Sequence, residues 1–175
     1  MRLILRATDA VNAVVTLATG LLLAVVVAAV AWQVSVRFVL TAAGINISAP
    51  WTEELARYAL IWMVFLGAGV GVRHARMIAL EFLIRKLPAA AGVPLRYAVT
   101  VISIAFFATM IWVGIQFVEL GRTETSPVMN LRKSWVYWAM PVGAALMVWN
   151  ALALVAETVL EGRDLRFASD HAPEE

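Results

Sequence analysis

The 175-residue chain contains no cysteine and only two histidines, His74 and His171. Without cysteine, disulfide exchange, thiolate metal sites and iron–sulfur ligation are excluded. Both histidines lie outside the long apolar runs, which argues against a haem held between membrane helices. The sequence also lacks a glycine-rich phosphate loop, an HExxH motif and a carboxylate cluster spaced to hold a metal. We therefore expect no catalytic residues, no metal site and no cofactor site in this chain.

Charged residues are also scarce, at 15% of the chain, whereas 62% of residues are hydrophobic. Four stretches carry no formal charge at all: residues 10–36, 58–72, 97–118 and 134–156. A bilayer core about 30 Å thick requires roughly 20 apolar helical residues. Three stretches are long enough as they stand, and the second becomes so if its helix begins near Thr52. The sequence thus predicts an all-α integral membrane protein with a single membrane domain over residues 1–175. Its transmembrane helices are expected at about 10–38, 52–73, 96–119 and 134–158, followed by a polar C-terminal tail at 161–175.

The first apolar run has a competing interpretation as a secretory signal. Arg2 and Arg6 precede it, and Ala29-Val30-Ala31 resembles a small-x-small cleavage site. The apolar region of a signal peptide is, however, only about 7–15 residues long. Because this run is nearly twice that length, we favour an uncleaved transmembrane helix.

The distribution of Lys and Arg predicts the orientation. Nine of the fourteen lie in the N-terminus, the loop between the second and third predicted helices and the C-terminal tail. Because cytoplasmic segments carry the excess of positive charge, we expect both termini in the cytoplasm. The basic residues do not gather on one soluble face, so a nucleic-acid partner is not expected. No ionisable residue lies at the middle of a predicted span, which argues against a pump, a channel or a coupled carrier formed by this chain alone.

The segment between the second and third predicted spans has an amphipathic pattern. Met77, Leu80, Ile84 and Leu87 recur at helical spacing, and Pro88 follows them. Basic side chains occupy other positions, namely Arg76, Arg85 and Lys86. So short a segment cannot span a bilayer, so we predict an interfacial helix at about 76–87 that contacts anionic lipid. The alternative to a lipid-binding face is a charged face that is only solvated.

Small residues and aromatic residues mark further candidate contacts. Gly67 and Gly71 form a G-x-x-x-G pair, and Ala139 and Gly143 form a second small-xxx-small pair. Either pair is a candidate for helix packing within the chain, with a partner or with another copy. At the start of the fourth predicted span, an aromatic belt is expected at the headgroup level, formed by Trp135, Tyr137 and Trp138.

The second predicted span begins with charged residues, which need an explanation in a membrane helix. Trp51 is placed to anchor at the interface, and Glu53 and Arg57 have the favourable i, i+4 order. We predict that Arg37 pairs with Glu53 or Glu54 and clasps the first two helices together at the periplasmic end. The alternative is a helix cap and a surface pair worth under about 1 kcal/mol.

The order of these features resembles the small membrane (DctQ-like) subunit of tripartite ATP-independent periplasmic (TRAP) transporters, over roughly residues 30–150. The similar motifs are Arg37, WTEE at 51–54, FLGA at 65–68, Arg73, LP at 87–88, WVY at 135–137 and PVG at 141–143. The chain departs from the family pattern where a histidine and an aspartate usually stand, because it has Met77 and Glu81 there. No role of that histidine is therefore carried over.

The resemblance implies a non-enzymatic scaffold subunit in the cytoplasmic membrane of a bacterium or archaeon. Its partners would be a large membrane subunit, which carries the substrate with coupling sodium ions, and a periplasmic protein that delivers an organic acid. The sodium ions would be bound by the large subunit. Two rival hypotheses are a free-standing four-helix carrier or channel and a membrane enzyme. The first needs polar residues along an axis, and the second needs a nucleophile or metal set at one depth.

Overall fold

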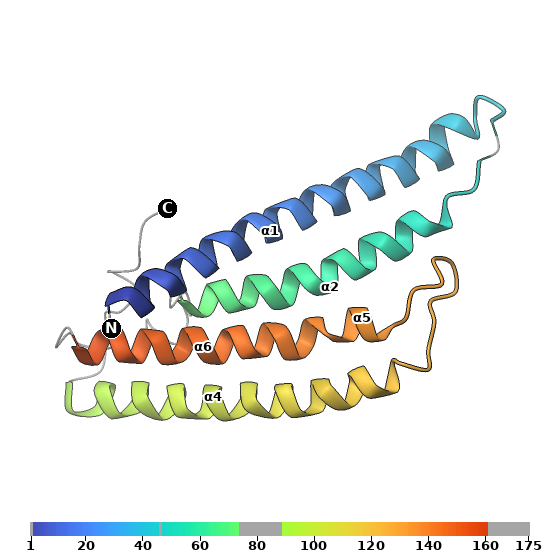
Figure 1. The fold of residues 1–175 in the computed structure, drawn as a ribbon. Coiled ribbons are helices and arrows are strands. Elements are labelled where there is room, and N and C mark those ends of the chain that lie inside the picture. The colour runs from blue at the N-terminus through green and yellow to red at the C-terminus, as the bar shows by residue number, and fades with distance from the viewer. Residues whose placement is uncertain (1, 46, 74–88, 161–175) are drawn as a thin grey trace.

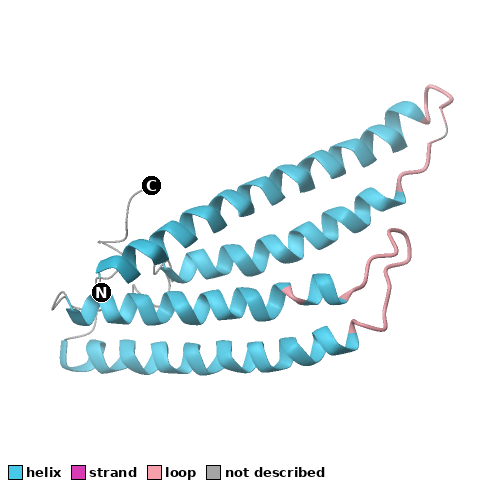
Figure 2. Cartoon of the chain, viewed as in Figure 1, coloured by secondary structure: helices cyan, strands magenta, loops and turns pink. Residues whose placement is uncertain are grey.

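The computed structural model describes residues 2–45, 47–73 and 89–160, and every named element in these ranges is a helix. Their bounds are α1 Arg2–Ser35, a short π-helix η1 Val36–Leu40, α2 Pro50–Arg73, α4 Ala89–Leu120, α5 Ser134–Tyr137 and α6 Ala139–Leu160 (Figures 1 and 2). Four of the helical segments are long and apolar enough to cross a membrane, which confirms the four-span, all-α prediction. The predicted interfacial helix at 76–87, with Arg76, Arg85 and Lys86, and the tail at 161–175 lie outside the described residues.

The long helices form a row and do not surround a central axis. α1 packs on α2, α2 packs on α6, and α6 packs on α4 (Figure 1). α1 also touches α6, whereas α1 and α4 make no contact with each other in the ranges that the structure describes. The two edges of the row are therefore α1 and α4, and each leaves a broad apolar face exposed, including Leu17, Leu21, Ile102 and Trp112.

The first span is longer than the predicted 10–38, because α1 begins at Arg2 and η1 carries it to Leu40. In η1 the backbone widens: both the N–H (3.2 Å) and the hydroxyl (3.0 Å) of Thr41 donate to the carbonyl of Val36, five residues earlier. Gly44, with φ of +81°, follows in the connection to α2. The charges that bound the apolar run, Asp9 and Arg37, do not interrupt the helix, because neither residue is a strong helix breaker.

Prolines explain two of the other boundaries. α2 starts at Pro50, two residues before the predicted start, because proline suits the first helical position. The predicted helix at 134–158 is divided at Trp138 into α5 and α6. Pro141 has no N–H to donate to the carbonyl of Tyr137, and its ring disfavours an uninterrupted helix there. α4 begins at Ala89 instead of residue 96, with Pro94 inside its second turn.

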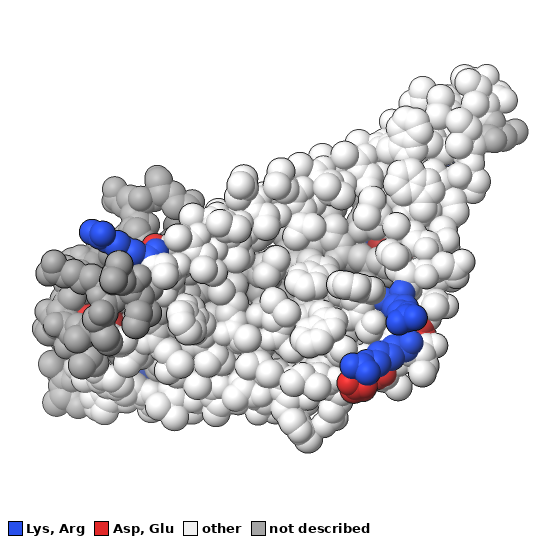
Figure 3. All heavy atoms as spheres, in the orientation of Figure 1, with Lys and Arg blue, Asp and Glu red and all other residues white. Residues whose placement is uncertain are grey.

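Charged residues gather toward the two ends of the row, and most of the visible face between them is uncharged (Figure 3). We name the ends by their buried charged residues. The Arg73 end comprises the start of α1 and the ends of α2 and α6, and the Glu54 end comprises the start of α2, the loop at 121–133 and α5.

Candidate functional site

At the Arg73 end, one buried arginine joins three helices. The Arg73 side chain is 3% exposed, and its Nη2 lies 2.9 Å from Oδ1 of Asp9 on α1. Its Nε donates to the same oxygen, and its Nη1 donates to Glu157 on α6. The two carboxylates pair with the guanidinium, which would otherwise be an unpaired buried charge. The three residues therefore hold the ends of α1, α2 and α6 at one level.

One turn further into the span, two asparagines form a reciprocal amide pair. Asn12 and Asn150 each donate a side-chain N–H to the other's side-chain oxygen at 2.8 Å. Asn150, which is fully buried, also donates to the backbone carbonyl of Gly69 at 2.8 Å. Trp149 donates its indole N–H to the hydroxyl of Thr8 at 3.1 Å. The buried Asn150 therefore links helices, and the link again joins α1, α2 and α6.

At the Glu54 end, a carboxylate fastens the loop at 121–133 to α2. Glu54 is 8% exposed and accepts hydrogen bonds from the hydroxyl of Tyr58 at 2.6 Å and from the backbone N–H of Met129 at 2.8 Å. The loop closes on itself, since the backbone N–H of Ser126 donates to the carbonyl of Leu131 and the hydroxyl of Ser126 accepts the backbone N–H of Leu131. Asn130 takes a positive φ of 52° at the turn, a conformation that asparagine tolerates.

Lys133 ends this loop and pairs with Glu124 at 3.0 Å. The hydrogen bond and the charge of Glu124 raise the pKa of the Lys133 ammonium above its ordinary value of 10.5. Because the pKa of this basic group is raised, the ion pair contributes its full stabilisation of the folded state at pH values below the ordinary pKa. This stabilisation is lost only as the pH rises through the raised pKa. The ionisation of Lys133 therefore does not change the stability of the loop near neutral pH.

The predicted clasp between Arg37 and the acidic start of α2 is wrong. Glu53 pairs with Arg57 on its own helix at 2.8 Å, and Glu54 turns toward the loop at 121–133. Arg37 lies instead over the ring of Phe38, with its Cζ 5.7 Å from the centroid. The reason is geometric: the first helical span extends past the start of α2 (Figure 1), and Arg37 belongs to η1 at the end of that span.

The glycine contacts differ from the predicted pairs on α2 but not on α6. A Cβ at Gly71 would meet nothing within 4 Å, and one at Gly67 would make only an ordinary 3.6 Å contact with Thr19. The close approach is at Gly69, where a Cβ would lie 2.6 Å from Leu146. On α6, a Cβ at Gly143 would lie 2.6 Å from Phe65, and Ala139 is fully buried. Gly69 and Gly143 therefore set the distance between α2 and α6.

The predicted aromatic belt divides into exposed and packed members. Trp135 is 68% exposed and Trp138 is 43% exposed, and their place at a membrane interface stays a prediction. Tyr137 instead packs edge-on against Phe117 of α4, with centroids 6.0 Å apart. Trp51, at the start of α2, is 45% exposed. Trp51, Trp135 and Tyr137 belong to the Glu54 end, and Trp138 follows α5 directly.

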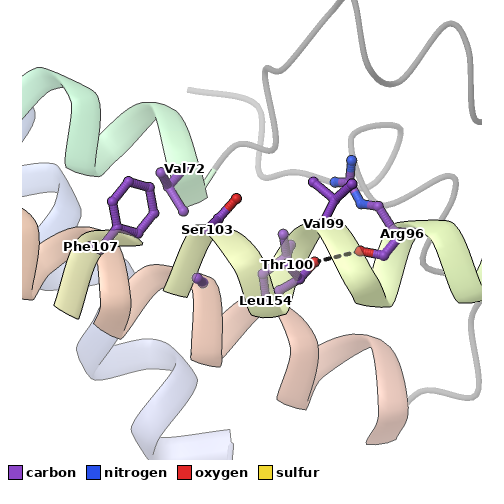
Figure 4. Close-up of a pocket in the computed structure, with 8 residues that line it drawn as sticks. Val72, Arg96, Val99, Thr100, Ser103, Phe107 and Leu154 are labelled. Atoms are coloured by element: carbon purple, nitrogen blue, oxygen red, sulfur yellow. Dashed lines mark hydrogen bonds between the residues drawn. The ribbon is translucent and has the colours of Figure 1, made fainter. Parts of the chain in front are cut away.

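A small cavity of about 40 Å³ lies toward the Arg73 end between α2, α4 and α6 (Figure 4). Its polar lining comes from α4, where Arg96 is 6% exposed and Thr100 donates its hydroxyl to the carbonyl of Arg96 at 2.9 Å. Ser103 also lines it, and the remaining walls are apolar. Its volume is enough for about one water molecule and not for an organic substrate.

Sequence reasoning missed the ion cluster around Arg73 and the role of Gly69. A signal for the cluster was present, because Asp9, Arg73 and Glu157 each bound an uncharged run, and the predicted topology places all three at one membrane face. Gly69 carried no such signal, since periodicity alone does not say which glycine of a run faces a neighbour. Among the described residues, no group of three or more His, Cys, Asp or Glu side chains could hold a metal ion.

Comparison with known proteins gives the family. Residues 26–161 match the family described as "Tripartite ATP-independent periplasmic transporters, DctQ component". The chain is 25% identical over 142 residues to the sialic acid TRAP transporter small permease protein SiaQ of Vibrio cholerae, covering 81% of this chain and 79% of that protein.

Two further relatives are shorter matches. The C4-dicarboxylate TRAP transporter small permease protein DctQ of Rhodobacter capsulatus is 30% identical over 118 residues, which cover 64% of this chain and 49% of that protein. The isethionate TRAP transporter permease protein DctMQ of Oleidesulfovibrio alaskensis is 28% identical over 114 residues, 64% of this chain and 18% of that protein. With a family match over most of its length and four apolar spanning helices, this chain belongs to the DctQ family, a non-enzymatic family of small permease subunits of TRAP transporters in the inner membrane.

Proposed function

We propose that the chain is a fixed scaffold subunit that packs beside the large membrane subunit of a TRAP transporter and carries no substrate itself. The observation that carries this proposal is the arrangement of the long helices in a row. A pathway needs helices around an axis, whereas α1 and α4 lie at opposite edges and do not touch in the described part of the chain. Both edges are then available for lipid or for a partner.

The packing between α2 and α6 supports a rigid role. Gly69 and Gly143 bring the two helices too close for even an added methyl group to fit without a shift. The polar side chains Asn12 and Asn150 are engaged with each other and with the backbone, so they are not presented to a permeant solute. Such a layer resists the rearrangement that alternating access would require of a carrier.

The named relatives support the choice of partners and of substrate class. One of them, named DctMQ, contains a stretch similar to this chain within only 18% of its length, which suggests that a much larger permease unit accompanies it. The relatives' names refer to sialic acid, isethionate and C4-dicarboxylates, and all of these are organic acids. We infer that this chain serves uptake of an organic acid, delivered by a periplasmic binding protein and coupled to sodium ions bound in the large subunit.

Reconstitution tests the scaffold role. Liposomes would contain this chain alone, its large TRAP membrane subunit alone, or both, with the binding protein and a labelled organic acid outside and a sodium gradient imposed. We expect uptake only when both membrane subunits are present. Uptake by this chain alone would support the rival carrier or channel instead.

The orientation with both termini in the cytoplasm is part of the proposal, and it rests on the excess of Lys and Arg on that side. The absence of native cysteine makes a direct test simple. Single variants Ser48→Cys, before α2, and Ala7→Cys, early in α1, would be treated in intact cells with a membrane-impermeant maleimide. We expect labelling at position 48 and protection at position 7, whereas the reverse pattern would overturn the orientation.

A further inference from the structure

A groove of about 470 Å³ opens at the Glu54 end of the row. It lies between the start of α2, the loop at 121–133 and α5. Its lining combines acidic, basic and apolar side chains. The charged and phenolic members are Glu53, Glu54, Arg57, Tyr58, Lys133 and Tyr137, and the apolar members include Ile61 and Val136.

Among the residues that line the groove, two carboxylates face two cations, and one of these cations, Lys133, also pairs with Glu124 outside the lining. Glu54 is occupied in holding the loop, but the Glu53–Arg57 pair is 61% and 66% exposed. That pair uses Oε1 of Glu53 and Nη2 of Arg57. A carboxylate has a second oxygen and a guanidinium has five N–H donors, so both groups retain capacity for a ligand. The groove therefore offers an acceptor for a cation beside donors for an anion.

The tryptophans at the same end indicate the level of the groove within the membrane. Trp51, Trp135 and Trp138 are 45%, 68% and 43% exposed, and exposed tryptophans concentrate at the headgroup level of a membrane protein. Ile61, one turn after Arg57 and two turns after Glu53, continues the lining along α2 toward the apolar part of the span. A molecule in the groove thus meets charge at the headgroup level and apolar side chains below it.

We propose that this groove binds phosphatidylethanolamine. The ammonium of the lipid donates hydrogen bonds to Glu53, and its phosphate accepts them from Arg57 and Lys133. The acyl chains run past Ile61 into the bilayer. Balanced charge favours a zwitterionic headgroup over an anionic one, and only a primary ammonium, unlike choline, has N–H donors for the carboxylate. This site concerns the chain alone and does not depend on the proposed scaffold function.

Native mass spectrometry of the purified full-length chain tests the proposal. The protein would be titrated with phosphatidylethanolamine, phosphatidylcholine and phosphatidylglycerol of identical acyl chains, and the lipid-bound fraction would be measured for each. The test variant is the double substitution Glu53→Gln/Arg57→Gln. The matched control is Glu119→Gln/Arg122→Gln, which removes a similarly exposed pair (58% and 64%) that does not line the groove.

We expect the native chain and the control to retain phosphatidylethanolamine in preference to the other two lipids. The groove variant should lose about fivefold in its retention of that lipid, the effect of removing exposed charge-assisted contacts. Circular dichroism would verify that all three proteins are folded, and Lys133→Met provides a second, milder groove variant. Equal retention of the three lipids by the native chain, or equal losses in the groove and control variants, would overturn the proposal.

Discussion

The two ends of the helix row use charge differently. At the Arg73 end, the ion cluster connects three helices, and its arginine is 3% exposed. At the Glu54 end, the Glu53–Arg57 pair lies within one helix and is mostly exposed. The buried Glu54 accepts a hydrogen bond from the loop at 121–133. The first end thus uses charge to fix helices to each other, whereas the second uses it to fold a loop and to leave a charged groove open.

The contrast extends to α1. Near its start, α1 reaches α6 through the Asn12–Asn150 pair and the Thr8–Trp149 hydrogen bond. Further along, it is held to α2 by small apolar contacts, a cluster of Val26, Ala29, Ala56 and Ala59 with Leu22. Close packing of small residues is a common way for helices to associate in lipid. We infer that the Arg73 end carries the interactions most sensitive to substitution, and four predictions test this.

The largest effect is expected at Arg73. The substitution Arg73→Gln leaves Asp9 and Glu157 without their cation, and we expect a loss of about 3 kcal/mol, the low end for a broken buried pair because both carboxylates are partly exposed. Arg57→Gln on the same helix is the matched control and should cost under about 1 kcal/mol. Unfolding in detergent micelles would measure both, and equal losses would remove the distinction between the two ends.

The middle of the row should respond next. In Gly143→Ala, the added Cβ would lie 2.6 Å from Phe65, so α6 must shift away from α2, at a cost of about 2 kcal/mol. Gly71→Ala has open space around it and should be neutral or slightly stabilising, since alanine favours a helix. The same unfolding assay would compare them, and a neutral Gly143→Ala would show that the contact is looser than described.

The asparagine pair should give a smaller effect. Asn150→Leu removes the hydrogen bonds to Asn12 and to the carbonyl of Gly69, and we expect a loss of about 1 kcal/mol, because such bonds in membranes are individually modest. In a double-mutant cycle, Asn12→Leu/Asn150→Leu should cost less than the sum of the single changes. Additive losses would mean that the two amides do not act as a pair.

The smallest effect on global stability is expected at Glu54. Glu54→Gln keeps one acceptor oxygen but loses the negative charge, and we expect a cost of about 0.5–1 kcal/mol. The local effect should be clearer: the amide of Met129 should exchange its hydrogen faster, while the amides of α6 stay protected. Hydrogen exchange with mass spectrometry would resolve the two regions, and unchanged exchange at Met129 would contradict the loop contact.

Particular residues show which features of the fold and the site can be predicted from the sequence. The spans were predictable because charge is absent from residues 10–36, 58–72, 97–118 and 134–156, and length and apolarity suffice to identify a membrane helix. The division of the last span was within reach, since Pro141 has no N–H for the preceding turn. The pairing of Glu54 was not, because its partner is the backbone N–H of Met129, 75 residues away. Backbone donors of a folded loop leave no trace in a residue pattern.

By itself, the sequence determined that this is a membrane protein of four helices, without cysteine chemistry, and a relative of TRAP small permease subunits, because composition and local motifs carry that information. Only the tertiary structure decided that the helices form a row and that Gly69 faces α6. It also decided that Arg37 pairs with neither Glu53 nor Glu54. These outcomes depend on helix rotation and on where each helix ends in space. A shift of one or two residues changes which side chains meet, while the apolar content of the span stays the same.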